Sequence, residues 1–181
     1  MSEKLLELVD LKKHYTAASS VFSRSTAVVR AVDGVSFSVS SGTTFSLVGE
    51  SGCGKTTITK VILLLERPTE GAVLFRGKPV HELSGQGLRD YKRSVQAVFQ
   101  DPAASMNPRM RVRDIIGEPL RVHDRMRGRA LASRVDELLH DVGLSPDVAM
   151  DYPHQFSGGQ RQRISIARAL ALKPELIVLD E

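Results

Sequence analysis

Apolar residues alternate with polar ones in the first part of the chain, and this period of two predicts β-structure. The alternation covers residues 5–15 and returns over residues 27–39, where the Asp33–Gly34 pair predicts a turn that interrupts the second segment. Residues 16–26 are rich in Ser and Ala and have no period, which predicts a surface loop between the two. Shorter apolar runs predict four more strands, the first and last of them buried, at residues 45–48, 72–77, 95–99 and 175–181.

Between these strands the apolar residues take on a helical spacing. Apolar residues from Leu131 to Val142 share one helix face, and Gly143 is placed to end that helix. Residues 100–110 hold two prolines and no period, which predicts a loop. Strands followed by helices predict an α/β fold with a helical insert around residues 101–157. The helical segments are expected at about residues 54–65, 88–94, 112–144 and 158–172.

The composition is that of an ordinary globular protein, with 41% hydrophobic and 25% charged residues in a chain of 181. No apolar run approaches the roughly 18 residues of a membrane-spanning helix, and the N-terminus lacks a signal-peptide pattern, which predicts a cytosolic protein. Cys53 is the only cysteine, which excludes an internal disulfide, and the histidines do not have the spacing of a structural zinc site. The net charge of +4 is compatible with a phosphate ligand or an acidic partner.

The octapeptide GESGCGKT, residues 49–56, matches the phosphate-binding pattern G-x-x-x-x-G-K-[ST]. It follows a predicted strand and opens a predicted helix, as the mechanism of such a loop requires. Its glycines allow backbone N–H groups to curl around nucleotide phosphates, and the helix adds its positive dipole end. Lys55 is expected to contact the β- and γ-phosphates, and the Thr56 hydroxyl to coordinate Mg²⁺. The residues expected to bind the nucleotide here are Gly49, Glu50, Ser51, Gly52, Cys53, Gly54, Lys55, Thr56 and Thr57.

The last apolar run, LIVLDE, ends in two adjacent carboxylates, Asp180 and Glu181. Taken alone, this pattern describes the end of a strand that meets solvent. Together with a phosphate-binding loop it is the Walker B arrangement, in which Asp180 binds Mg²⁺ and Glu181 polarises the attacking water. Side chains of neighbouring strand residues point apart, so one carboxylate can face the metal while the other faces the γ-phosphate.

A third motif, FSGGQRQR over residues 156–163, opens the last predicted helix. Small residues at a helix N-terminus leave N–H groups for an anion. With this motif shortly before a Walker B strand, the chain resembles the ATP-binding subunits of ABC transporters over essentially its whole length. The resemblance implies a P-loop NTPase fold, with a RecA-like core, an antiparallel β subdomain and an inserted α-helical subdomain. It divides the chain into a β subdomain and P-loop core (1–100), a helical subdomain (101–157), and a signature helix with the Walker B strand (158–181).

The resemblance also implies how the third motif acts. In the family, this signature closes over the ATP that is held by the P-loop of a partner subunit, in a two-fold dimer with two ATP molecules between the subunits. The residues of this chain that carry it are Ser157, Gly158, Gly159 and Gln160.

Two further positions fit the family. Gln100 ends a predicted strand, where the resemblance implies contact with Mg²⁺ and the attacking water. Tyr15 ends the first strand, where it implies an aromatic ring that stacks on adenine; Phe22 is a weaker alternative, and Tyr15 can also be read as a surface aromatic. The expected catalytic residues are then Glu181, Lys55 and Gln100, and the expected metal ligands Thr56, Gln100 and Asp180.

Several stretches narrow the resemblance to the ATPases of the oligopeptide, dipeptide and nickel uptake group: AVDGVSFSV, VGESGCGKTT, AVFQDPAASMNPRM and DIIGEPL. They imply an importer subunit that binds ATP and Mg²⁺ and couples ATP hydrolysis to uptake of peptides or a related solute. The implied partners are a second ATP-binding subunit, in a homo- or heterodimer, and two membrane-spanning permease subunits. An extracytoplasmic solute-binding protein acts indirectly. The implied location is the cytoplasmic face of the inner membrane.

The sequence leaves two alternatives open. Family members continue past the Walker B glutamate, so the chain is expected to be truncated there, and a non-hydrolysing nucleotide-binding fragment is the first alternative. The second is an ABC ATPase without a transport role, although the FQDP and NPRM stretches argue against it. No nucleic-acid partner is expected, because no aromatic residues interleave with the arginines of the helical insert, Arg121, Arg125, Arg127, Arg129 and Arg134.

Overall fold

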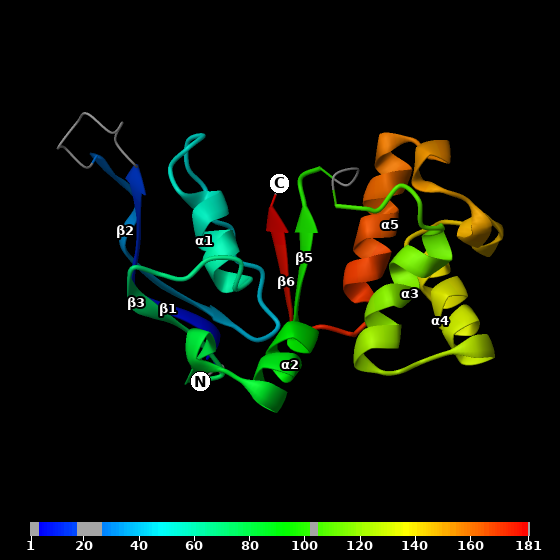
Figure 1. Cartoon of the computed structure of the whole chain (residues 1–181), viewed down its shortest axis with the longest axis horizontal. Helices are drawn as coiled ribbons and strands as arrows, with labels where there is room; N and C mark the ends of the chain where they lie inside the picture. The colour runs from blue at the N-terminus through cyan, green and yellow to red at the C-terminus, as the bar shows by residue number, and fades with distance from the viewer. Residues whose placement is uncertain (1–3, 18–26, 102–104, 181) are drawn as a thin grey trace. The chain divides into compact units, whose positions relative to one another are not determined.

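The computed structural model of the chain describes residues 4–17, 27–101 and 105–180 (Figure 1). The chain divides into two compact units, Met1–Tyr91 and Lys92–Glu181, and each is described by itself. None of the helices in the described ranges combines the length and the apolar character that crossing a membrane requires.

An antiparallel sheet in the order β2-β1-β3-β4 forms the frame of the first unit. The long strands β1 (Lys4–Ala17) and β2 (Ala27–Ser40) pair with each other, and β3 (Glu70–Phe75) pairs with the other edge of β1. β4 (Lys78–Pro79) completes the sheet beside β3. Leu8 and Leu11 of β1 are 2% and 0% exposed, and they form the centre of this unit's core. The predicted antiparallel β-structure is confirmed.

β2 is one continuous strand, so the turn predicted at Asp33–Gly34 is wrong. Lys12 pairs with Asp33 and Leu11 pairs with Val35, which leaves Gly34 as an extra residue in a β-bulge. Gly34 takes a φ of 78°, which glycine adopts without steric cost. An Asp-Gly pair favours the left-handed backbone of a turn and of a bulge alike, and pairing with β1 decides between them.

Helix α1 (Lys55–Ile62) follows the Gly-rich loop and buries Ile58, Val61 and Ile62. It ends earlier than the predicted residue 65, because the chain takes a left-handed conformation at Leu64, with a φ of 59°. Helix α2 (Gly85–Ser94) is longer than predicted, and its Tyr91 is buried against this unit. The Tyr91 hydroxyl donates a hydrogen bond of 2.6 Å to the Ile62 carbonyl at the end of α1, while burial raises the pKa of Tyr91.

Residues 45–48 do not form the buried strand that the sequence predicts. Val48 is 91% exposed, and Phe45 is 46% exposed although its ring stacks on Phe37 of β2 at a centroid distance of 4.7 Å. A buried parallel strand depends on strands beside it and on layers over both faces. In the described part of the first unit every strand pairing is antiparallel, and residues 45–48 take part in none of them.

The second unit joins a parallel strand pair to a bundle of helices. β5 (Val95–Phe99) lies where it is predicted, and it runs parallel to β6 (Leu176–Asp180). β6 is not buried as predicted, with Leu179 69% exposed, because β5 is its one described neighbour and α5 packs on β5. The stretch from 112 to 144, where a helical pattern is predicted, consists of two helices, α3 (Val112–His123) and α4 (Gly128–Asp141), and α5 (Gly158–Leu170) follows. Short 3₁₀ turns occupy Val80–Glu82, Pro146–Met150 and Pro153–Gln155.

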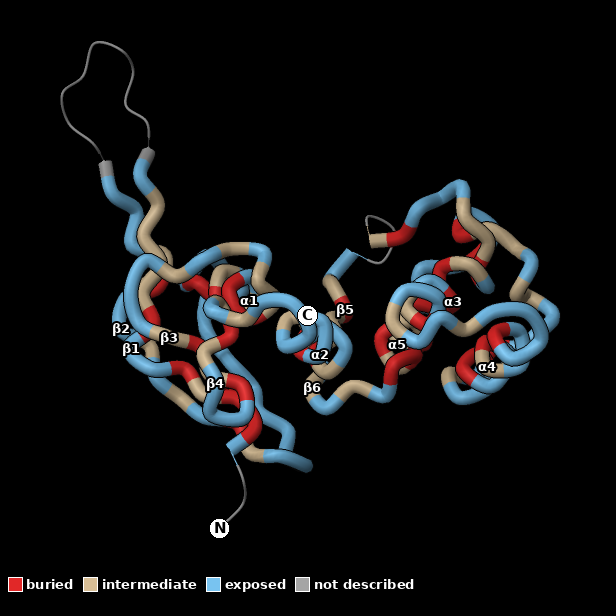
Figure 2. The backbone as a smooth tube through the Cα atoms, turned by 60° about the horizontal axis from the view of Figure 1, so that its bottom comes forward, coloured by how far each residue is buried: buried red, intermediate tan, exposed pale blue. Residues whose placement is uncertain are grey.

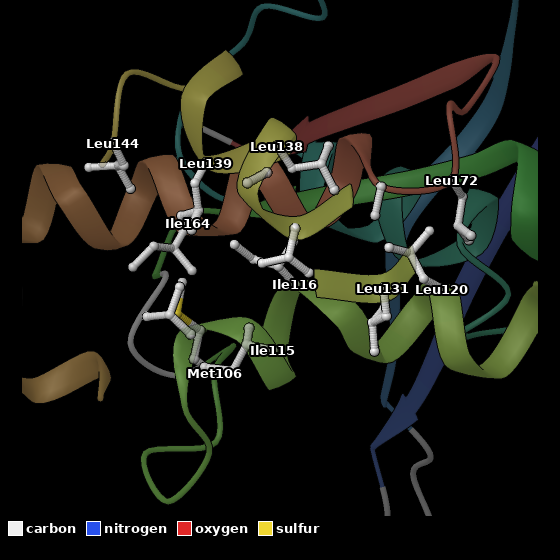
Figure 3. Packing of buried hydrophobic residues seen from close by; sticks show 14 of the residues in the cluster. Met106, Ile115, Ile116, Leu120, Leu131, Leu138, Leu139, Leu144, Ile164 and Leu172 are labelled. Carbon is white, nitrogen blue, oxygen red and sulfur yellow. The ribbon is translucent and has the colours of Figure 1, made fainter. Parts of the chain in front are cut away.

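The three helices of the second unit enclose its hydrophobic core. Ile116 of α3, Leu139 of α4 and Ile164 of α5 are each 0% exposed, and Figure 3 shows them directed toward one another. The buried stretches of all three helices appear as red segments in Figure 2. The helical spacing seen in the sequence therefore marks the faces that meet in this core.

A Leu139→Ala substitution is expected to lower the free energy of unfolding by about 3 kcal/mol, because it leaves a cavity among α3, α4 and α5. Chemical denaturation followed by circular dichroism measures the change. Val122→Ala on α3 is the matched control, since Val122 is 69% exposed and its loss should leave stability nearly unchanged. Equal losses in the two variants would contradict the described packing.

Candidate functional site

The loop predicted to bind phosphates lies at the start of α1 in the first unit. Gly54 precedes the helix with a φ of 98°, and a β-carbon there would lie 2.2 Å from the Ala31 carbonyl oxygen, so only glycine fits. The Lys55 ammonium folds back over the loop and donates hydrogen bonds to the carbonyl oxygens of Gly49, at 2.6 Å, and Glu50, at 2.8 Å. A cation is thus held beside a helix N-terminus, an arrangement suited to a phosphate. The other predicted residues complete the loop or the first turn of α1: Ser51, Gly52, Cys53, Thr56 and Thr57.

Cys53 lies inside this loop. Its Sγ lies 3.7 Å from the Lys55 Nζ, and a β-carbon added to Gly49 would lie 2.6 Å from the same sulfur. Cys53 is a free and exposed thiol. A reagent can therefore reach a sulfur that packs closely against the loop's own backbone.

Alkylation of Cys53 with N-ethylmaleimide is expected to weaken ATP binding by about tenfold or more, because overpacking a tight site costs roughly 1–3 kcal/mol. A fluorescent nucleotide titration of treated and untreated protein measures the effect. Cys53→Ser is the control, and it should bind nucleotide normally and ignore the reagent, since Cys53 is the only cysteine. Unchanged affinity after complete alkylation would refute the expectation.

Tyr15, predicted to stack on adenine, lies on β1 and is half-buried. Its hydroxyl donates a hydrogen bond of 2.5 Å to the Glu66 carboxylate, and the Lys13 ammonium lies 5.0 Å from the ring centroid. Burial and the Glu66 hydrogen bond raise the pKa of Tyr15, while a hydrogen bond from the Thr57 side chain lowers it. The structure thus brings Tyr15 next to the helix that the phosphate loop opens. Phe22 lies outside the described residues.

In the second unit, Gln100 and Asp180 lie at the carboxyl ends of the two parallel strands β5 and β6. Phe99 and Asp180 are paired in register, and Gln100 is the next residue after β5. The carboxyl ends of parallel strands are where α/β sheets bind their ligands. Glu181 lies outside the described residues. Over residues 4–17, 27–101 and 105–180, no three His, Cys, Asp or Glu side chains form a metal-binding cluster, but Mg²⁺ held by one carboxylate and substrate phosphates needs none.

The signature motif forms the N-terminus of α5. The Ser157 Oγ accepts a hydrogen bond of 3.3 Å from the Gln160 N–H, and the Gln160 Oε1 accepts one of 3.0 Å from the Ser157 N–H, which together make a capping box. The amide oxygen of Gln160 is therefore committed to its own helix, while the Ser157 O–H can still donate to a ligand. A β-carbon at Gly158 or at Gly159 would meet nothing within 4 Å. Both glycines leave this helix end open.

Two residues with evident structural roles were not predicted from the sequence. Glu66 follows α1 and binds the hydroxyl of Tyr15. Arg168 of α5 donates a hydrogen bond of 2.8 Å to the Ser105 carbonyl, and burial lowers its pKa. The available signal for Arg168 was its position four residues after the buried Ile164, which places a cation on the buried side of the helix.

The arginines of the helical insert lie on α3, on α4 and in the segment that joins them. Arg121 forms an ion pair with Asp114, and Arg134 forms one with Glu137 at 2.9 Å. These two cations are thus paired within their own subdomain.

Residues 32–181 match the family model described as ABC transporter. The chain is 52% identical to the oligopeptide transport ATP-binding protein AppF of Bacillus subtilis, over 99% of this chain and 55% of that protein. It is 46% identical to the glutathione import ATP-binding protein GsiA of Pectobacterium atrosepticum, over 99% of this chain and 29% of that protein. The chain spans about half the length of AppF, and less of GsiA.

Solved structures give the same picture of the fold. The dimeric post-hydrolysis structure of the ATP-binding cassette MJ0796 bound to ADP and Pi has a TM-score of 0.84 and 30% sequence identity, and the match covers 98% of this chain and 74% of that one. The structure of cbiO1 from Clostridium perfringens, part of the ABC transporter complex cbiONQ, has a TM-score of 0.77 and 25% identity, covering 99% and 66%. These likenesses confirm the predicted P-loop fold class.

Proposed function

The chain belongs to the ABC transporter family, and we propose from this premise that it is the ATP-binding part of an importer for peptides or a related solute. The observation that carries the proposal is the Lys55 ammonium, held over the Gly-rich loop by the Gly49 and Glu50 carbonyl oxygens at the start of α1. A nucleotide phosphate offers this ammonium stronger partners than neutral carbonyls do, because a charged acceptor makes the stronger hydrogen bond.

The proposal gives each site residue a task. Lys55 binds the β- and γ-phosphates, Tyr15 stacks on the adenine, and Gln100 orients the attacking water, with Glu181 as the general base. Mg²⁺ would be held by Thr56, Gln100 and Asp180, and it would neutralise charge on the phosphates. The signature residues Ser157, Gly158 and Gly159 would close over the nucleotide of a second copy or a related subunit, and Gln160 would keep this helix end in shape.

The proposed organisation keeps the division into residues 1–100, 101–157 and 158–181. The proposed partners are a second ATP-binding subunit, two membrane-spanning permease subunits and, indirectly, an extracytoplasmic solute-binding protein. A subunit that drives permease subunits with ATP would lie at the cytoplasmic face of the membrane. AppF and GsiA, by their names, serve oligopeptide and glutathione import, which supports a peptide-like solute for this chain.

Calorimetric titration of the full protein with ATP tests the proposal, with Mg²⁺ and with EDTA in its place. We expect binding that is tighter with Mg²⁺, together with phosphate release that stops when EDTA is added. A parallel titration with GTP measures how strongly the Tyr15 site prefers adenine to guanine. The preference should be weak, because an aromatic ring can stack on any base. A protein that binds no nucleotide in the presence of Mg²⁺ would contradict the proposal.

A further inference from the structure

Glu66 is the centre of a small charged network at the end of α1. Its carboxylate accepts the Tyr15 hydroxyl and lies 3.4 Å from the Lys13 Nζ and 3.7 Å from the Lys60 Nζ. The side chain is 22% exposed, so most of it is withdrawn from water. The Tyr15 hydrogen bond and the two lysines lower the pKa of Glu66, which keeps it ionised as a hydrogen-bond acceptor.

The residues around this carboxylate come from two elements of the first unit. Lys13 lies on β1, two residues before Tyr15, and its ammonium also donates a hydrogen bond of 2.9 Å to the Arg67 carbonyl. Lys60 lies in the last turn of α1. Glu66 is therefore contacted from the strand and from the helix at once, and these contacts restrict its carboxylate.

Tyr15 is anchored beyond the end of α1 and lies close to the start of the same helix. Glu66, after the end of α1, accepts its hydroxyl, and the Thr57 side chain, in the first turn of α1, lies near enough to lower the pKa of Tyr15. Thr57 directly follows the predicted Mg²⁺ ligand Thr56. A phenol ring at a strand end can otherwise turn about its side-chain torsions, and holding it saves the ordering entropy that a ligand would have to overcome.

We propose that Glu66 is a positioning residue for the base of the nucleotide, which acts by holding the Tyr15 ring at a fixed place relative to the phosphate loop. This role rests on the proposed function, because it presupposes that the loop binds a triphosphate. The ring and the loop then form one preorganised site, in which a base can stack while its phosphates lie on Lys55. Glu66 touches no ligand, and its effect reaches the nucleotide through Tyr15 alone.

The role predicts that Glu66 matters for nucleotides and not for a ligand without a base. In Glu66→Ala, the affinity of the full protein for MgATP should fall about five- to tenfold, the loss expected when the ligand has to order one side chain on binding. The affinity for Mg²⁺-tripolyphosphate should not change, since that ligand has no base to stack. Titration calorimetry with both ligands measures the two values. Glu66→Gln, whose amide oxygen can still accept the Tyr15 hydroxyl, should restore part of the MgATP affinity.

Further variants separate this role from a structural one. Tyr15→Phe removes the hydroxyl and keeps the ring, so it should lose as much MgATP affinity as Glu66→Ala, and the double variant should lose no more than either. Glu70→Ala is the matched control, because Glu70 forms the same kind of hydrogen-bonded ion pair, at 2.8 Å with Lys12, without contacting Tyr15. MgATP affinity that is normal in Glu66→Ala, or that falls equally with tripolyphosphate affinity, would overturn the role. A wild-type protein that binds neither ligand would overturn the proposed function and this role with it.

Discussion

A Lys55→Ala variant of the full protein is expected to bind MgATP about 10- to 100-fold more weakly, since a hydrogen bond to a charged group contributes roughly 1.5–3 kcal/mol. Hydrolysis should fall further, by about 10²–10³-fold, because in the proposed site the same ammonium would face the charge that develops on the transferred phosphoryl group. In the structure the Lys55 Nζ is bound to the Gly49 and Glu50 carbonyl oxygens, 2.6 Å and 2.8 Å away. These oxygens would be exchanged for phosphate oxygens when nucleotide binds.

The folded state should tolerate the loss of Lys55. Gly49 and Glu50 are exposed, so water can replace the ammonium at their carbonyl groups. Lys78→Ala is the matched control, because Lys78 is an exposed lysine on β4 of the same unit and lies outside the phosphate loop. Calorimetry, phosphate release and circular dichroism on the three proteins give affinity, activity and folding. Wild-type affinity for MgATP in Lys55→Ala would refute the assignment of the loop.

The elements that were predicted best are those with local determinants. β5 has the predicted bounds, and α5 begins at the predicted residue because Ser157 and Gln160, three positions apart, cap each other. The prediction of a strand at residues 45–48 was wrong. A short apolar run forms a strand only where other strands lie beside it, and the run itself does not specify those strands. The same limit applied at Gly34, where a bulge and a turn place the same demand on the backbone.

The residues of the candidate site also differ in how much of their role the sequence reveals. The phosphate loop could be proposed from the sequence because its residues are consecutive; the structure places Lys55 over that loop, and its binding of phosphate stays a prediction. Glu66 was not predictable, because 51 positions in the sequence separate it from the Tyr15 hydroxyl that it binds. The capping role of the Gln160 side chain was also missed, although Ser-x-x-Gln is the pattern of a capping box.

Gly158 offers the sharpest test of that signature. A β-carbon at this position meets nothing within 4 Å, and Gly158 is the first residue of α5. A side chain there should not disturb the fold, and an acidic one should stabilise the helix by about 0.3–1 kcal/mol through its dipole. Gly158→Asp is nevertheless expected to lower ATP hydrolysis by about 100-fold or more, because its carboxylate would face phosphate charge in a site from which water is excluded.

The comparison of Gly158→Asp with Gly158→Asn isolates charge from size, because the two side chains have nearly the same shape. Asn should retain most of the hydrolysis that Asp loses, and equal losses would assign the defect to bulk at the partner's surface. MgATP binding to the protein's own phosphate loop should be unchanged in Gly158→Asp, since in the proposed dimer this helix end serves the nucleotide of the other subunit. If hydrolysis falls while MgATP affinity and stability stay at the wild-type values, Gly158 acts on the nucleotide bound by the partner subunit. If MgATP affinity falls as well, Gly158 acts on the nucleotide bound by its own chain.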